Sequence, residues 1–362
     1  MPPHAGGLEL VVHNLVEGLR ARGHDLRWIA SSAPEAPGRS GHLVRVPAWN
    51  LLERTAHVPL PLWGPEAHRQ LWNGCRWADV VHVHDCLYPS SASAIAVARL
   101  LRRPVVMTQH IARVPYGPLL DAVQALAYRT LGRALLRSVD EVAVYSPHVA
   151  RHVERLGVSR PAHLISLGFD ARFASPTPAA RRAARAAYEL PEHAKLALFV
   201  GRLVPKKGVD QLAALQRTAP RDMLLWVVGD GPLAHLVADL PRTRHVRSVP
   251  YEHMHTLFAA ADLLILPSRG EGFPLAVQEA LLTGLPAVVS DDPAYLTNLE
   301  GAPGVWFAPD LEALRAGVER ALGAGIERAT IAAWASARFR RDRFIAAYEQ
   351  LYEGLCLLPR DA

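Results

Sequence analysis

Residues 261–290 read ADLLILPSRGEGFPLAVQEALLTGLPAVVS and contain a strand, a turn, a helix and a second strand in succession. The apolar runs at 262–266 and 287–290 have the length of buried strands. A Gly-rich turn follows the first run, and Pro274 fits the first turn of the helix between them. Buried strands joined by a helix predict a parallel sheet with helices on its faces.

The same alternation continues through the rest of the chain. Further strands are predicted at 25–30, 42–46, 79–84, 104–108, 140–145, 162–166, 196–200, 223–228, 245–248 and 304–307. The Pro-, Ala- and Arg-rich segment 174–193 interrupts the rhythm and marks a domain boundary. We predict an α/β protein with two doubly wound, Rossmann-like domains, residues 1–175 and 176–335, that face a cleft. Residues 336–362 are expected to end in a helix that packs back towards the first domain.

The first predicted domain lacks the strand with which an open α/β domain normally begins. The segment MPPHAGG leads directly into a helix predicted at 8–22. Further helices are predicted near 65–76, at 91–101 and at 118–138. We therefore expect the first strand of this domain to be missing, and a truncated start is our hypothesis for its absence.

The composition is that of a globular chain. Of its 362 residues, 50% are apolar and 20% are charged, which excludes disordered and coiled-coil classes. Cys75, Cys86 and Cys356 are odd in number and have no ligand-like spacing, which favours reduced thiols in a cytoplasmic protein. Apolar runs such as 260–267 are too short to cross a bilayer, and the first residues do not resemble a secretory leader.

The net charge of +6 comes mostly from arginine. Arg129, Arg133 and Arg137 recur every fourth residue in the helix predicted at 118–138, so they form one stripe along it. Such a stripe fits the anionic inner face of a membrane, and it is equally typical of an exposed helix in a chain of this composition. Peripheral membrane contact and a solvated helix therefore both remain open, and no nucleic-acid partner is expected.

Two acids near the turn in the opening stretch need an explanation, because carboxylates are rarely buried without a partner. The amides of Gly272, Phe273 and Leu275 lie where a helix start can hold a phosphate. Glu271 would then bind a cation or ligand hydroxyls beside that phosphate, and Glu279 the two hydroxyls of a ribose. The alternative is that Glu271 complements the helix dipole and Glu279 lies on a solvated face.

The loop after the strand at 196–200 contains two candidate cations, Arg202 and Lys207. Two cations at the carboxyl end of a strand suit a diphosphate whose charge grows as it leaves. A solvated basic loop is the alternative. Weaker candidates are Asp230, in the Asp-Gly turn of VVGDGPL, and Gly7, where the backbone could approach a ligand closely.

Histidines follow two neighbouring predicted strands. His82 and His84 point to one face and precede Asp85, and His110 ends the next strand. No third ligand at a suitable spacing follows, so no metal site is expected. His110 is expected to face the cleft, where a lone histidine is more often structural than catalytic.

Taken in order, these segments resemble a glycosyltransferase with the GT-B fold, of the large retaining family four. The resemblance covers nearly the whole chain, from GGLELVVHNLVEGLRARGHDL to EGFPLAVQEALLTGLPAVVS. Between them lie ADVVHVHD, RRPVVMTQH, VDEVAVYS, LGFDARF, LFVGRLVPKKGVD, VVGDGP and FAAADLLILPS. Single motifs of this kind are loose, whereas eight or nine in the right order are specific.

The resemblance implies transfer of a hexose from a nucleotide diphosphate sugar to an acceptor hydroxyl, with retention of configuration and no metal or other cofactor. The matching residues are the diphosphate-holding cations (Arg202, Lys207), the acid near the sugar hydroxyls (Glu271), the ribose-binding acid (Glu279), the histidine at the reacting face of the sugar (His110) and the N-terminal glycine (Gly7). Envelope polysaccharide or glycolipid synthesis, with a lipid-linked acceptor, is the pathway we expect.

Two rival functions share this fold. One is a nucleotide-sugar 2-epimerase or an inverting transferase, and the other is a protein that binds nucleotide sugars without catalysis. The two cations and two acids favour the retaining transferase over both rivals. Neither a Gly-x-Ser-x-Gly elbow, a phosphate-loop lysine signature nor a dinucleotide Gly-x-Gly-x-x-Gly motif is present.

Overall fold

The computed structural model describes residues 7–32, 38–49, 62–115, 117–168, 172–191 and 193–357. The chain divides into two compact units. Unit 1 comprises residues 1–113, 118–168 and 341–362, and unit 2 comprises residues 114–117 and 169–340. The boundaries predicted from the sequence were at 175 and 335, and the last helix was expected to return to the first domain.

Unit 2 is built on one six-stranded parallel sheet. Its strands are β9 (Lys195–Val200), β10 (Met223–Val228), β11 (Thr243–Val246), β12 (Leu263–Leu266), β13 (Ala287–Ser290) and β14 (Val305–Ala308). Their order in the sheet is β11-β10-β9-β12-β13-β14. This is the doubly wound order, in which the winding reverses between β9 and β12, and ligands bind at the carboxyl ends of the strands at that point.

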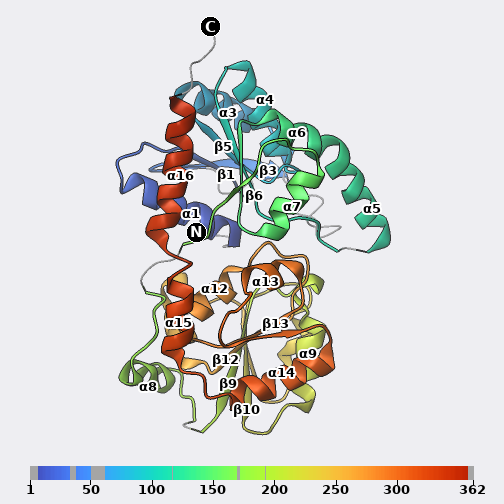
Figure 1. Ribbon diagram of the computed structural model, residues 1–362, viewed down its shortest axis with the longest axis vertical. Coiled ribbons are helices and arrows are strands. Elements are labelled where there is room, and N and C mark those ends of the chain that lie inside the picture. The colour runs from blue at the N-terminus through green and yellow to red at the C-terminus, as the bar shows by residue number, and fades with distance from the viewer. Residues whose placement is uncertain are drawn as a thin grey trace. The chain divides into compact units, whose positions relative to one another are not determined.

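Helices cover both faces of this sheet (Figure 1). The helices α9 (Val209–Thr218) and α14 (Leu311–Gly323) pack against each other on one face, and α12 (Leu275–Leu282) packs against α15 (Arg328–Ser336) on the other. Every residue of β12 is buried, as expected for a central strand covered on both sides. Unit 2 also contains α10 (His235–Ala238), α11 (Tyr251–Ala260), α13 (Pro293–Asn298), the short 3₁₀ turn Pro205–Lys207, and α8 (Pro178–Ala187), which is described next.

The segment predicted to contain the domain boundary, 174–193, includes a helix that the sequence analysis did not predict, α8 (Pro178–Ala187). Thr177 caps it by accepting a hydrogen bond from the amide of Ala180, and Pro178 occupies its first turn. Arg181 and Arg185 reach from this helix to Asp262, which directly precedes β12. Half-buried ion pairs therefore attach the boundary segment to the rest of unit 2.

Unit 1 has two sheets instead of one. In one, β1 (Trp28–Ser32) pairs in parallel with β3 (Leu43–Trp49), and β2 (Gly38–Ser40) and β4 (Leu62–Trp63) pair antiparallel with β3. The other is parallel and has the order β5 (Val81–His84), β6 (Val105–Gln109), β7 (Glu141–Val144), β8 (His163–Leu164). Among the described residues, no strand precedes the first helix.

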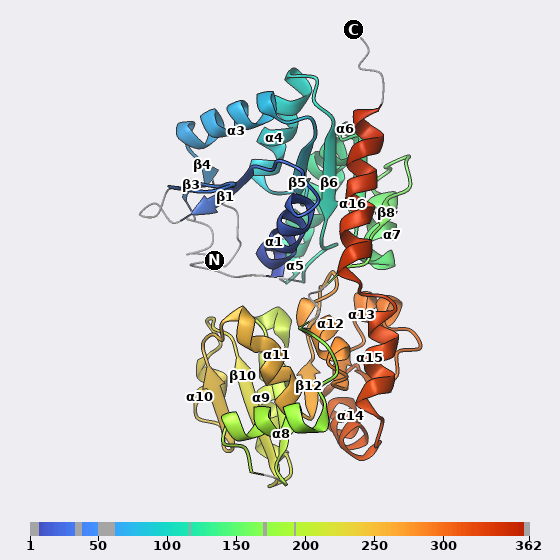
Figure 2. The ribbon, with the colours of Figure 1, turned by 90° about the vertical axis from the view of Figure 1, so that its left-hand side faces the viewer.

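The last helix of the chain completes unit 1. It is α16 (Arg341–Cys356), and it lies beside α1 (Gly7–Arg20) (Figure 2). The buried Tyr348 shares a 2.8 Å hydrogen bond with Thr108 of β6, and Tyr352 bonds to Nδ1 of His82 at 2.7 Å. These bonds fasten α16 to the sheet. The other helices of unit 1 are α3 (Pro65–Trp77), α4 (Pro89–Leu100), α7 (Pro147–Arg155) and the segment described next.

The single long helix predicted at 118–138 is interrupted. It consists of α5 (Pro118–Ala127), a π-helical turn (Tyr128–Gly132) and α6 (Arg133–Ser138). Tyr128 is buried in this turn, and its hydroxyl donates to the carbonyl of Ala112 at 2.7 Å. A π turn changes the helical register, so the predicted arginine stripe does not run straight, although all three arginines are exposed.

Candidate functional site

The loops that follow β9 and β12 meet at the point where the sheet winding reverses. The amide of Arg269 donates to the carbonyl of Lys206 at 2.7 Å, which joins the two loops. Side by side with this bond, Nζ of Lys207 lies 2.7 Å from Oε1 of Glu271. The lysine and glutamate side chains are only 14% and 7% exposed. Two residues singled out separately from the sequence thus form one buried ion pair.

Each charge of the Lys207–Glu271 pair favours the ionised form of the other residue. Burial lowers the pKa of Lys207, and the neighbouring Glu271 opposes that shift without cancelling it. Burial alone would raise the pKa of Glu271, but the positive charges of Lys206 and Lys207 outweigh it, so this pKa is lowered. The Glu271 carboxylate is therefore ionised at neutral pH, with a lysine as its partner.

A third loop packs backbone to backbone against the first. The amide of Leu203 donates to the carbonyl of Asp230 at 2.9 Å, and the amide of Leu233 donates to the carbonyl of Leu203 at 3.0 Å. A Cβ at Gly229 would lie 1.9 Å from the carbonyl oxygen of Gly201, so only glycine fits there. The exposed side chains of Arg202 and Asp230 thus belong to two joined loops at the carboxyl edge of the sheet.

The start of α12 offers backbone donors beside the ion pair. Pro274 caps the helix from outside, one residue earlier than the predicted first turn, and Leu275 is its first residue. The amides of Gly272 and Phe273 donate to no acceptor within the described part of the chain, and the first amides of any helix lack intrahelical acceptors. This arrangement can hold an anion such as a phosphate.

Glu279 is buried inside unit 2. It is 4% exposed, and its Oε1 accepts a 2.9 Å hydrogen bond from the hydroxyl of Tyr251 on α11. Burial raises the pKa of Glu279 to about 7, and the bond from Tyr251 only partly opposes this. The alternative of a solvated Glu279 is therefore wrong. A buried carboxylate with one hydroxyl partner has capacity for further donors.

The histidines form a polar group in unit 1. Nδ1 of His84 lies 3.0 Å from Nε2 of His110, and the His110 amide donates to Asp85 at 2.8 Å. Burial lowers the pKa of His84 to about 4 and that of His110 well below its ordinary value, so both rings are neutral. The described residues contain no group of three His, Cys, Asp or Glu side chains arranged to hold a metal ion. Gly7 is the exposed first residue of α1.

The structure thus pairs Lys207 with Glu271 and joins the loops of Arg202 and Asp230. Glu279 lies further along α12 with Tyr251 as its partner, and His110 and Gly7 belong to unit 1. Sequence reasoning missed two residues that support the site. Tyr251 binds Glu279, and Asp292 accepts a 2.6 Å hydrogen bond from the amide of Gly270 while capping α13. The Asp-Pro pair at 292–293 is a helix-start signal that could have indicated the capping role of Asp292. No sequence pattern predicts the contact between Tyr251 and Glu279.

Comparison with known proteins identifies relatives of both units. Residues 5–173 match the family described as Glycosyltransferase Family 4, and residues 180–336 match Glycosyl transferases group 1. The glycogen synthase of Mycobacterium tuberculosis is 30% identical over 358 residues, 89% of this chain and 83% of that protein. A GDP-mannose-dependent alpha-mannosyltransferase of Corynebacterium glutamicum is 28% identical over 307 residues, 79% of this chain and 69% of that protein.

Solved structures share the fold. Anabaena HepE in complex with UDP-glucose superimposes with a TM-score of 0.74, at 18% identity, over 98% of this chain and 98% of that one. At this level of identity the likeness concerns the fold, which is two Rossmann-like α/β domains of the GT-B type. The described residues contain no helix long and apolar enough to cross a bilayer.

Proposed function

This chain belongs to the glycosyltransferases of family 4 and group 1, and from that premise we propose that it transfers a hexose from a nucleotide diphosphate sugar with retention of configuration. The observation that carries the proposal is the buried Lys207–Glu271 pair at the reversal point of the unit 2 sheet. The structural neighbour HepE is solved with UDP-glucose, which supports a nucleotide sugar as the donor.

Each residue of the site has a role in this proposal. Lys207 and the exposed Arg202 stabilise the diphosphate as it leaves, because its negative charge grows in the transition state. The amides of Gly272, Phe273 and Leu275 hold the same group. Glu271 keeps the lysine in place and accepts from the sugar hydroxyls, and Glu279 accepts from the ribose.

The bonds balance without a protein nucleophile. The bond between the anomeric carbon and the phosphate oxygen breaks, a bond to the acceptor oxygen forms on the same face, and the acceptor proton passes to the departing diphosphate. The proposal includes no metal, since the two cations and the helix-start amides supply the positive charge. His110 is assigned to the reacting face of the sugar by resemblance, and its neutral ring can accept or donate one hydrogen bond.

Donor turnover tests this function. The purified protein is incubated with UDP-, GDP- and ADP-sugars, each with and without a panel of hydroxyl acceptors. We expect acceptor-dependent release of the nucleoside diphosphate and a product with the anomeric configuration of the donor, read by NMR. An epimerised sugar, an inverted product, or donor binding without transfer to any acceptor would contradict the proposal in favour of one of the rival functions.

The surface of α5 supports a lipid-linked acceptor at the cytoplasmic face of a membrane. No residue of α5 is buried, and Figure 1 shows the helix at the margin of unit 1. Its exposed aliphatic residues are Leu119, Leu120, Val123 and Leu126. The exposed Arg129, Arg133 and Arg137 follow them along the chain. Aliphatic side chains beside cations fit the boundary between acyl chains and anionic headgroups.

Vesicle co-sedimentation tests this contact. We expect the protein to sediment with vesicles of anionic phospholipid, less with neutral ones, and less with anionic ones as salt rises. The double variant Leu119→Gln/Leu126→Gln should lose this binding while keeping turnover of a soluble acceptor analogue. Leu100→Gln is the matched control, because Leu100 is equally exposed on another helix (72% against 78% for Leu119). Equal binding by both variants would contradict the assignment to α5.

A further inference from the structure

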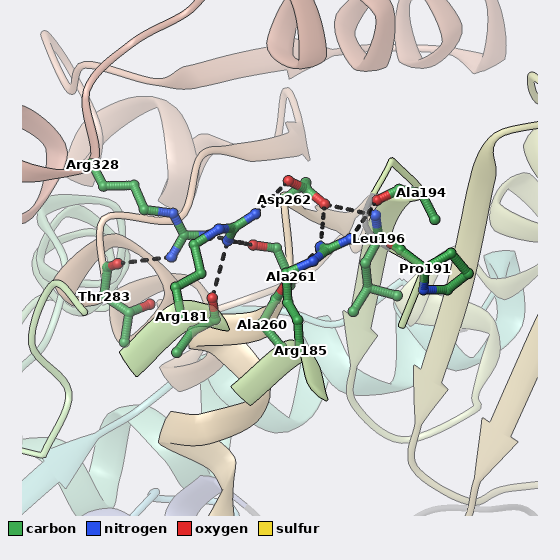
Figure 3. Close-up of polar contacts among 11 residues, drawn as sticks. Arg181, Arg185, Pro191, Ala194, Leu196, Ala260, Ala261, Asp262, Thr283 and Arg328 are labelled. Carbon is green, nitrogen blue, oxygen red and sulfur yellow. Dashed lines mark hydrogen bonds and ion pairs between the residues drawn. The ribbon is translucent and has the colours of Figure 1, made fainter. Parts of the chain in front are cut away.

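A second group of cations, half-buried, lies at the opposite edge of the unit 2 sheet, at the amino ends of its strands. Figure 3 shows Arg181 and Arg185 from α8 and Arg328 from α15 gathered near Asp262. Arg181 pairs with Asp262 at 2.6 Å and Arg185 at 3.1 Å. The Asp262 carboxylate also accepts a 2.8 Å hydrogen bond from the amide of Leu196. This one carboxylate therefore serves two guanidinium groups and an amide.

Arg328 forms no ion pair with a carboxylate among the described residues, although the charge of Asp262 favours its protonated form. Its hydrogen bonds go to backbone carbonyls, to that of Thr283 at 3.3 Å and to that of Ala261. Arginine has five N–H donors, so these two bonds leave donors for another acceptor. In Figure 3 its guanidinium lies next to that of Arg181. Two neighbouring guanidiniums repel each other, and the repulsion is strong where water is scarce.

A cavity of about 170 Å³ adjoins this group. Arg328 and Asp262 line one part of it together with Lys195, whose ammonium is exposed and forms no ion pair in the described chain. Pro286, Trp306, Leu322 and Ile326 form the apolar part of the lining. The space far exceeds that needed for one water molecule. A lining that combines two cations with apolar side chains suits a small ligand with an anionic end and an organic body.

We propose that this cavity binds a small organic phosphate, at a site separate from the donor site. The phosphate would accept hydrogen bonds from the free donors of Arg328 and from Lys195. It would add negative charge to a group in which Asp262 is the single anion among four cations. The apolar wall would cover the organic part. The charge balance of the group supports this, since three arginines and a lysine face one aspartate among these residues.

The titration of Arg328 provides a second line of support. Burial, followed by the charge of Arg181, lowers the pKa of Arg328 to about 9. A bound phosphate would favour the charged guanidinium, so binding and protonation would be linked. We therefore expect the affinity for phosphate to fall as the pH is raised above about 9.

Thermal unfolding with added ligand tests the proposal. The probes are glucose 1-phosphate, glycerol 3-phosphate and inorganic phosphate, with glucose and glycerol as uncharged controls. Because the donor site can also hold phosphate, each probe is titrated against wild type, Lys195→Met, Lys207→Ala and the control Arg217→Met, which removes one exposed charge elsewhere. Lys195→Met is preferred to an Arg328 variant, because Lys195 is exposed and its loss leaves the fold intact.

We expect the organic phosphates to stabilise wild type, Lys207→Ala and Arg217→Met alike. Lys195→Met should weaken the binding about tenfold, the loss expected for one charge-assisted hydrogen bond. Organic phosphates should also change the fluorescence of Trp306, and Trp306→Phe should remove that change. Stabilisation that disappears in Lys207→Ala but persists in Lys195→Met would assign the phosphate to the donor site and overturn the proposal. No stabilisation of wild type would overturn it as well, while leaving the proposed transferase function untouched.

Discussion

Glu279→Gln should make the protein more stable at alkaline pH and should lower its affinity for the nucleotide-sugar donor. Glu279 is buried with Tyr251 as its hydrogen-bond partner, and its pKa is raised from 4.5 to about 7. An acid with a raised pKa contributes stability below its unfolded pKa, and this contribution is lost as the pH rises through the folded pKa. Ionisation of Glu279 therefore opposes folding above about pH 7, and glutamine has no charge to bury.

The size of the effect follows from the shift. A difference of about 2.5 pKa units, from 4.5 to about 7, corresponds to about 3 kcal/mol at pH 8 and to nothing at pH 4. The glutamine amide adds N–H donors that have no assured acceptor, at a cost of about 1–3 kcal/mol. That cost does not depend on pH. The diagnostic quantity is therefore the slope of the stability difference between pH 4.5 and 8.

Urea unfolding of wild type and Glu279→Gln at several pH values measures this slope. The stability of the variant relative to wild type should rise with pH by roughly 3 kcal/mol over that interval. Glu300→Gln, at an exposed position, is the control and should show no such slope. In turnover assays at pH 8, Glu279→Gln should raise the KM for the donor more than it lowers kcat, because it loses a ribose acceptor. A flat difference across the pH range would refute the buried-carboxylate argument.

Two further changes test the donor loops. Lys207→Ala should lower kcat strongly and leave the fold intact, because the lysine acts on charge that develops in the transition state. A loss within about threefold, which is only about 0.6 kcal/mol of barrier, would contradict that role. Gly229→Ala should destabilise unit 2 by at least about 1–3 kcal/mol, since its Cβ would meet the Gly201 carbonyl at 1.9 Å. Gly323→Ala, which meets no atom within 4 Å, should unfold like wild type in the same scan.

In unit 2, the pattern of apolar residues predicts where the strands lie but not which strands are neighbours. The strands predicted at 196–200 and 262–266 differ by one residue from β9 and β12, because buried parallel strands read as short apolar runs between turns. The pairing of Lys207 with Glu271 depends on which strands are neighbours, and that order is set by tertiary packing. The sequence could place both residues at strand ends, but it could not place one against the other.

The misses have local physical causes. No helix was predicted in the boundary segment 174–193, yet the Thr177–Pro178 pair is a helix-start signal and the arginines four residues apart lie on one face of α8. The helix predicted at 118–138 is interrupted at Tyr128, the first residue of the π turn, whose hydroxyl donates to the carbonyl of Ala112. Apolar spacing contains no information about such a bond.

The return of α16 to unit 1 bears on how the protein is made. The nascent chain finishes residue 168 long before it reaches Tyr348 and Tyr352, the hydroxyl partners of Thr108 and His82. At a ribosomal rate of about 5–20 residues per second, the roughly 180 residues between these points take on the order of 10–40 s. Throughout that time the first unit to emerge is incomplete, while the second can already close its sheet. Unit 1 is therefore synthesised first but can be completed only after α16 has been made. A truncation that removes α16 should destabilise unit 1 more than unit 2.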